Sequence, residues 1–187
     1  MNISISDINW LYYKYYADNP ELKRIVMVHS DQVAKKALEI CKKKKLELNI
    51  QEVYCAAMLH DIGVVKCNAP GIYAHGKAPY IQHGLEGKKI LDANGLSQYS
   101  NICTNHTGAG ITKEEIKNNN LPLPLADMTP KTLLEKLICY SDKFFSKSKD
   151  LTKEKSLDQV IKDMGRLGED SLKRFMEMHQ VFGELDK

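Results

Sequence analysis

Apolar residues recur along most of this chain at the three- and four-residue spacing of an amphipathic helix, and no segment alternates convincingly as a strand does. Several of these stripes begin just after a residue that caps helices well. The first predicted helix is rich in tyrosine and capped by Ser6 or Asp7, and the second begins at Asn19-Pro20. Four more helices are predicted at about 30–45, 49–60, 84–94 and 97–106. A short helix follows Thr112, and a helix that carries Asp142 starts at Thr129-Pro130. With two more amphipathic patterns after residue 147, we predict an all-α fold.

The segment 64–82 interrupts the helical pattern with two prolines and two glycines. Irregular segments of this length are uncommon inside a domain and are usually functional or disordered. We keep two interpretations: a lid over a substrate that includes His75, Gly76, Lys77 and Tyr80, or a solvated loop with no such role.

Five residues with metal-binding side chains fall on the apolar faces of the predicted helices, and a sixth, Asp61, directly follows one of these five, His60. His60, for example, continues the stripe of the helix before it, and Asp142 follows Leu134 and Ile138 in steps of four. A carboxylate among core residues costs several kcal/mol unless cations or donors lie close by. The full set is His29, His60, Asp61, His83, His106 and Asp142.

A single histidine on an apolar stripe is more often a satisfied core residue than a ligand. His179 illustrates this, because it shares a face with Phe175 and Phe182 but belongs to no motif, and His75 fits a plain surface position as well. Periodicity alone therefore selects too many residues. Four imidazoles and two carboxylates taken together suit one or two divalent transition metals.

Composition sets broad limits. The 187 residues suit one domain, and a net charge of +3 is too small and dispersed to indicate a nucleic-acid partner. The lysine run 42–45 reads as a solvated helix C-terminus. Five cysteines without CxxC spacing fit reduced thiols, and neither a signal peptide nor a membrane span is evident. We expect a cytoplasmic protein with no membrane partner; its oligomeric state is not readable.

The order His29, His60-Asp61, Asp142 resembles the HD superfamily of metal-dependent phosphohydrolases, and His60-Asp61-Ile62-Gly63 matches its HDIG form. The similarity runs from about residue 25 to 146. Further on, His83-Gly84 and His106-Thr107-Gly108 look like the extra histidines of di-iron members, such as the bacterial HD-type hydrolases of diadenosine tetraphosphate; the latter stretch is also similar to uncharacterised HDIG proteins. The resemblance implies an HD-domain helical bundle in a single domain, 1–187, with a short N-terminal helical addition and a helical tail, 147–187.

Carried over to this chain, the resemblance implies a first metal on His29, His60, Asp61 and Asp142. Asp61 would bridge to a second metal held by His83 and His106. We expect two divalent ions, with iron as first choice and manganese, zinc or nickel as alternatives. A hydroxide between them, oriented by Asp61, would attack a nucleotide or another small phosphorylated metabolite.

One departure affects substrate binding: many HDIG proteins have lysine directly after the glycine, where this chain has Val64. The candidate substrate-binding residues are Lys66, His75, Lys77, Thr107 and Lys143. The signature of cyclic-di-GMP phosphodiesterases is absent after His106. Two other functions stay open: an HD-type di-iron oxygenase, and a non-catalytic module that binds metal or nucleotide for regulation.

Overall fold

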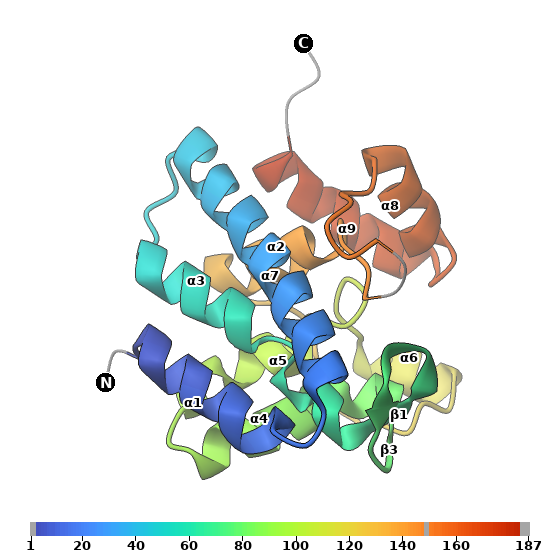
Figure 1. The fold of residues 1–187 in the computed structure, drawn as a ribbon. Helices are drawn as coiled ribbons and strands as arrows, with labels where there is room; N and C mark the ends of the chain where they lie inside the picture. Colours follow the sequence, from blue (N-terminus) through green and yellow to red (C-terminus); the bar gives the residue numbers. More distant parts are fainter. Residues whose placement is uncertain (1–2, 148–149, 184–187) are drawn as a thin grey trace.

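Helices dominate the structure, a computed structural model that describes residues 3–147 and 150–183 (Figure 1). Within these ranges the α-helices are α1 (Ile5–Tyr16), α2 (Pro20–Lys44), α3 (Ile50–Leu59), α4 (His83–Ala93), α5 (Ser100–Asn105), α6 (Lys113–Asn118), α7 (Leu133–Asp142), α8 (Leu157–Gly165) and α9 (Glu169–Phe182). Short 3-10 helices are η1 (Ile62–Lys66), η2 (Pro70–Ile72), η3 (Tyr80–Gln82) and η4 (Ser97–Tyr99). The predicted fold class, all-α, is confirmed.

Three predicted helix caps are confirmed. The side chains of Asn19 and Asn49 accept hydrogen bonds from backbone amides at the starts of α2 and α3, with Pro20 as the first residue of α2. Thr112 forms a reciprocal capping box with Glu115 at the start of α6. These polar side chains satisfy amide groups that the first helical turn leaves unpaired, which is why they mark helix starts in a sequence.

Three predicted boundaries are wrong. Ser4, rather than Ser6 or Asp7, caps α1. The helix expected at 30–45 already begins at Pro20, because no residue between the two points breaks it. α7 begins after Thr132, whose side chain accepts the backbone N–H of Glu135, instead of at Thr129-Pro130.

The segment 64–82 contains a small sheet, so the expectation of a chain without strands is wrong there. Its strands are β1 (Cys67–Ala69), β2 (Ala74–His75) and β3 (Ala78–Pro79), in the order β2-β1-β3. β1 pairs antiparallel with β2 and parallel with β3. Strands of two or three residues are too short to show the alternation by which a strand is recognised in a sequence.

The long helix α2 crosses the molecule, with α3 and α7 packed against it, and α4 pairs with α5 (Figure 1). The α4–α5 pair is tight at two glycines. A Cβ at Gly84 would lie 2.3 Å from the backbone oxygen of Cys103, and one at Gly87 would lie 3.0 Å from the Cys103 side chain. The absence of side chains at these two positions therefore permits the close approach of α4 and α5.

The tyrosine-rich helix α1 packs on the core and supports the chain on either side of the His60-Asp61 pair. The Tyr12 hydroxyl donates to the Met58 carbonyl at 2.8 Å, and the Tyr16 hydroxyl donates to the Ile62 carbonyl at 3.0 Å. Both tyrosines are almost completely buried. Each ring therefore fills the core while its hydroxyl satisfies a buried backbone carbonyl.

We expect Tyr16→Phe to lower the free energy of unfolding by about 1 kcal/mol, because it removes one buried hydrogen bond and keeps the ring. Urea denaturation followed by circular dichroism measures the change. Tyr13→Phe is the matched control, since Tyr13 lies on the same helix and is 69 % exposed. Equal effects of the two substitutions would show that the hydrogen bond from Tyr16 to the Ile62 carbonyl does not stabilise the fold.

The structure also bears on the cysteines and on membrane-spanning helices. All five cysteines are free thiols, as predicted, and the structure places all five in the interior. None of the helices in the described part of the chain is long and apolar enough to cross a membrane.

Candidate metal centre

The six residues singled out in the sequence converge at one buried place, although they come from five separate parts of the fold. His29 lies in the middle of α2, the His60-Asp61 pair follows α3, His83 begins α4, His106 follows α5 and Asp142 ends α7. None of the six is more than 8 % exposed. Helix ends thus supply most of the polar groups, while helix bodies supply the apolar shell around them.

The six side chains form two clusters that share Asp61. Candidate ligand atoms lie within 4.8 Å of one another in each cluster, the first made of His29, His60, Asp61 and Asp142, and the second of Asp61, His83 and His106. The Oδ2 atom of Asp61 lies 3.2 Å from His29 Nε2 and 3.0 Å from His60 Nε2. Its Oδ1 atom lies 3.5 Å from the Nε2 atoms of both His83 and His106. One carboxylate therefore presents a different oxygen to each cluster.

Three of the four imidazoles are oriented by backbone carbonyls. The Nδ1 atoms of His60, His83 and His106 lie 2.6, 2.8 and 3.0 Å from the carbonyl oxygens of Ala57, Tyr80 and Ile102, respectively. A proton on each Nδ1 would leave Nε2 to face the centre, the arrangement that protein groups around metal sites usually impose.

The donor atoms fit a divalent cation. Asp61 Oδ1 and His60 Nε2 are buried without a well-aligned hydrogen-bond partner in the described part of the chain. The other carboxylate oxygen of Asp61, Oδ2, lies 2.6 Å from the Lys147 ammonium. His83 Nε2 and His106 Nε2 face each other at 3.0 Å, which would set two lone pairs against each other if both imidazoles are neutral. Buried polar atoms without hydrogen-bond partners destabilise the folded protein, and a cation bound between these atoms would supply the missing interaction. The cluster therefore indicates divalent metal binding.

Lysines stabilise the two buried carboxylates in their charged form. Burial alone would raise the pKa of Asp61, but His60 and the Lys147 ammonium outweigh it and hold this pKa well below the usual value. Lys143 and Lys147 do the same for the pKa of Asp142 against the effect of burial. Both carboxylates are thus anionic at neutral pH and available as ligands.

The surroundings of His83 and His106 favour the neutral imidazole, whereas those of His60 favour the protonated one. Burial and the neighbouring His106 lower the pKa of His83 to about 3, and burial also lowers the pKa of His106. For His60 burial acts in the same direction, but the Asp61 and Asp142 carboxylates outweigh it and raise its pKa to about 9. A metal that binds His60 would therefore displace a proton, whereas His83 is already neutral.

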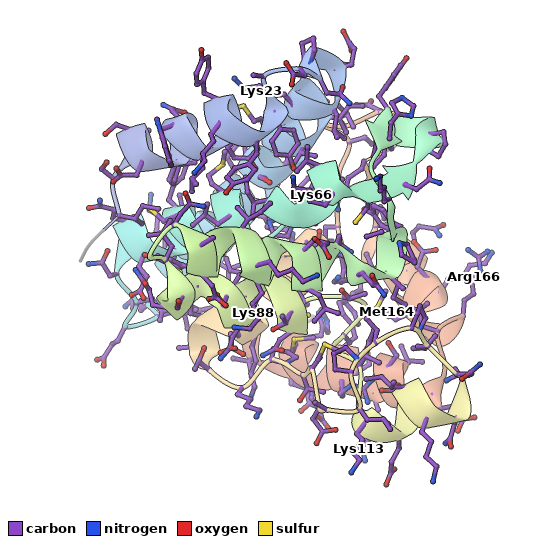
Figure 2. The ribbon with its side chains drawn as sticks, turned by 90° about the horizontal axis from the view of Figure 1, so that it is seen from below. Lys23, Lys66, Lys88, Lys113, Met164 and Arg166 are labelled. Atoms are coloured by element: carbon purple, nitrogen blue, oxygen red, sulfur yellow. The ribbon has the colours of Figure 1, made fainter. Side chains whose placement is uncertain are left out.

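The predicted substrate-binding residues have different locations. Lys143 is buried at the centre, where its ammonium contacts Asp142 Oδ2 at 2.5 Å and the His106 carbonyl at 2.8 Å. Thr107 adjoins His106 and is half-buried. The other three are exposed, namely Lys66 (labelled in Figure 2), His75 and Lys77. The Lys66 ammonium lies 5.7 Å from the centre of the Tyr15 ring.

Sequence reasoning missed Lys147, whose ammonium lies 2.6 Å from Asp61 Oδ2. The ion pair with Asp61 raises the pKa of Lys147 above its usual value despite burial. Lys147 stands in a run of serines and lysines with no apolar pattern. The one available signal was its position four residues after Lys143.

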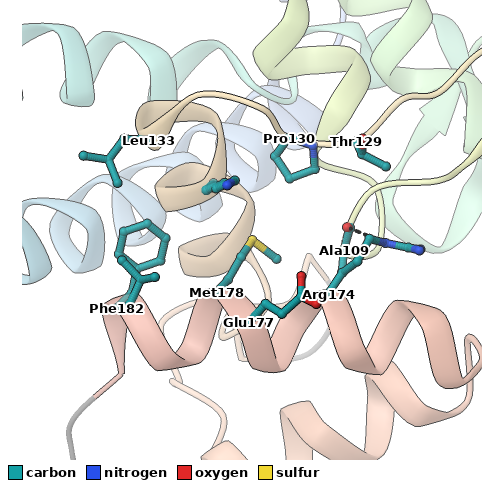
Figure 3. A pocket seen from close by; sticks show the side chains of 10 residues that line it. Ala109, Thr129, Pro130, Leu133, Arg174, Glu177, Met178 and Phe182 are labelled. Carbon is teal, nitrogen blue, oxygen red and sulfur yellow. Dashed lines mark hydrogen bonds between the residues drawn. The ribbon is translucent and has the colours of Figure 1, made fainter.

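The tail helix α9 holds the loop that follows His106. Gly108 and Gly110 both have positive φ angles, 59° and 84°. The Arg174 guanidinium donates to the Ala109 carbonyl at 3.2 Å (Figure 3). It also donates to the Gly110 carbonyl at 2.9 Å and pairs with Glu115 at 2.7 Å. A cavity of about 370 Å³ lies beside this contact, and none of the six candidate ligands lines it.

His179, the other histidine on an apolar stripe, lies outside the centre. Its Nδ1 atom is 2.9 Å from the Tyr140 hydroxyl, and its ring lies against Phe175. A packed and hydrogen-bonded role accounts for its position.

Comparisons with known proteins agree with this geometry. The HD domain family model matches residues 26–146. An uncharacterised protein of Methanocaldococcus jannaschii is 34 % identical over 87 % of this chain and 90 % of its own length. Proteins named tRNA (cytidine(56)-2′-O)-methyltransferase from Thermoplasma volcanium and Picrophilus torridus are 30 % and 32 % identical over 91 % and 57 % of this chain, but only 44 % and 28 % of their own lengths match. No solved structure matches.

Proposed function

Since the chain belongs to the HD domain family, we propose that it is a metal-dependent phosphohydrolase that acts on a nucleotide or another small phosphorylated metabolite. The observation that carries the proposal is the placement of Asp61 between two clusters of candidate ligands. Two divalent ions that share one carboxylate are typical of enzymes that hydrolyse phosphate esters and anhydrides.

Under this proposal His29, His60, Asp61 and Asp142 hold the first ion, and Asp61, His83 and His106 hold the second. When bound, such ions supply an activated water near neutral pH and polarise phosphoryl oxygens. Iron is our first choice for both positions, with manganese, zinc or nickel as alternatives, because mixed imidazole and carboxylate ligands accept all of them.

The charges of the protein groups support a phosphorylated substrate. Asp61 and Asp142 contribute −2, and the ammonium groups of Lys143 and Lys147 contribute +2, so the charges of these four side chains cancel. Two divalent ions would make the centre strongly positive. Because the site is buried, this charge would attract a phosphate group with little screening by salt.

The names of two relatives do not change the proposed substrate class. More than half of each methyltransferase-named relative lies outside the match, and the activity in those names belongs to proteins with additional sequence. We therefore propose a small substrate and no nucleic-acid partner, in line with the net charge of +3.

The test is a substrate screen with metal-stripped protein reloaded with Fe²⁺, Mn²⁺, Zn²⁺ or Ni²⁺. We expect phosphate release from at least one compound in a panel of phosphomonoesters, dinucleotide polyphosphates and cyclic nucleotides, and none without metal. Metal-replete protein that is inert on the whole panel would overturn the proposal. Oxygen uptake with an organic substrate would indicate an oxygenase instead, and tight binding of an unaltered nucleotide would indicate a regulatory module.

A further inference from the structure

The side chain of Lys147 enters the candidate metal centre from the segment after α7. Its ammonium lies 2.6 Å from Asp61 Oδ2, and the side chain is only 14 % exposed. The same oxygen is the one closest to His29 Nε2 and His60 Nε2. Lys147 therefore contacts the oxygen of Asp61 that faces the four-residue cluster.

Lys143 is held in a different way. Its ammonium contacts Asp142 Oδ2 and the His106 carbonyl. The other oxygen of Asp142, Oδ1, still faces His29 Nε2 at 2.8 Å and His60 Nε2 at 3.5 Å. Lys143 thus leaves a ligand atom of its carboxylate available, whereas Lys147 covers the ligand atom of Asp61.

A divalent ion and the Lys147 ammonium compete for this position. Metal–ligand bonds to imidazole and carboxylate are about 2.0–2.2 Å long, so an ion held by His29, His60 and Asp61 would lie next to the present ammonium position. Two cations at such a short distance repel each other strongly in a buried site. One of them must move away when the other binds.

We propose that Lys147 is a built-in counter-cation of Asp61 that a divalent ion displaces, and that the displaced ammonium then binds the phosphate group of the substrate. This inference rests on the proposed function. Lysine suits the role because its four-carbon stem lets the ammonium reorient while the backbone stays in place. Burial raises the pKa of the neighbouring Tyr80 phenol, so this group is uncharged at neutral pH. It would therefore not retain the Lys147 ammonium as a carboxylate does.

The other candidate cations fit the phosphate role less well. Val64, which stands where many HDIG proteins have lysine, is completely buried in the core and carries no charge. Lys66 and Lys77 are exposed, and the Lys66 ammonium lies over the Tyr15 ring. Lys147 already reaches the ligands, and an ammonium is a good point charge for a phosphate oxygen.

Metal titration of stripped Lys147→Met and Lys147→Gln proteins tests the first half of the inference. Removing the competing charge should let both variants bind the first Mn²⁺ or Zn²⁺ about tenfold more tightly than wild type, in competition with a chromophoric chelator. Metal-free Lys147→Met should melt at a lower temperature than wild type, because Asp61 loses its counter-ion, and metal should raise its melting temperature by more. Lys173→Met, a substitution at an exposed lysine of α9, is the matched control.

Calorimetry with inorganic phosphate on metal-loaded proteins tests the second half. We expect both neutral variants to bind phosphate about tenfold more weakly than wild type, and Lys147→Arg to retain part of the affinity. Metal affinity that is unchanged or weaker in both neutral variants, or unchanged phosphate affinity, would overturn the inference. Neither readout requires turnover. A wild-type protein that binds metal and phosphate but hydrolyses nothing would therefore refute the proposed function alone.

Discussion

Replacing Asp61 with alanine is expected to remove both metal ions, whereas His106→Ala is expected to remove only the second. The reason is that Asp61 Oδ2 faces the first cluster and Oδ1 faces the second, while His106 belongs to the second alone. Elemental analysis after gel filtration should give about two ions per chain for wild type, about one for His106→Ala and close to none for Asp61→Ala. Loss of the second ion alone should also remove most of the proposed phosphohydrolase activity.

Two further variants separate loss of ligands from loss of fold. Asp61→Asn keeps the size of the side chain and removes its charge, so it should lose metal as Asp61→Ala does while disturbing the packing less. Asp18→Ala, a substitution at an exposed aspartate after α1, should keep the full metal content. Full metal content in Asp61→Ala would contradict the bridging role. Loss of both ions in His106→Ala would contradict the division into two clusters.

The burial of most candidate ligands could be predicted because they stand on apolar helical stripes, and the resemblance to the HD superfamily distinguished them from His179, which stands on such a stripe too. His60, His106 and Asp142 lie at the ends of apolar helical stripes, and a residue on such a stripe points into the core wherever the helix packs. The caps at Asn49 and Thr112 placed the neighbouring helices correctly for a similar reason, since a capping bond spans only three residues.

What the sequence did not reveal depends on contacts that leave no pattern of residue types along the chain. The sheet in 64–82 is built from strands of two or three residues whose pairing, not their composition, defines them. Lys147 leaves no periodic signal, because the chain has left α7 before it reaches this residue, and its significance comes from Asp61, far away in the sequence. The carbonyls that orient the imidazoles belong to the backbone and carry no residue-type signal at all.

Substituting Gly63 by alanine should have the largest effect on stability of any change discussed for this protein. A Cβ at Gly63 would lie 2.1 Å from the backbone oxygen of His83 and 2.2 Å from the backbone nitrogen of Gly87. Backbone atoms in the first turns of α4 cannot give way as a flexible side chain can, so η1 and α4 must separate. We expect a loss of more than about 4 kcal/mol in the free energy of unfolding, measured by urea denaturation, or failure to fold.

Gly71→Ala supplies the control that distinguishes close packing from the general effect of adding a methyl group. No atom outside its immediate neighbours lies within 4 Å of a Cβ at Gly71, and its backbone does not require a left-handed conformation. Alanine there should be neutral or should stabilise the protein by about 0.4–1 kcal/mol, because it restricts the unfolded chain. Because His83 begins α4, any Gly63→Ala protein that folds should also lose the second metal ion, and Gly71→Ala should keep it. If both variants instead unfold like wild type, η1 does not pack on α4 as closely as the structure shows, and the position of His83 beside Asp61 has to be explained in another way.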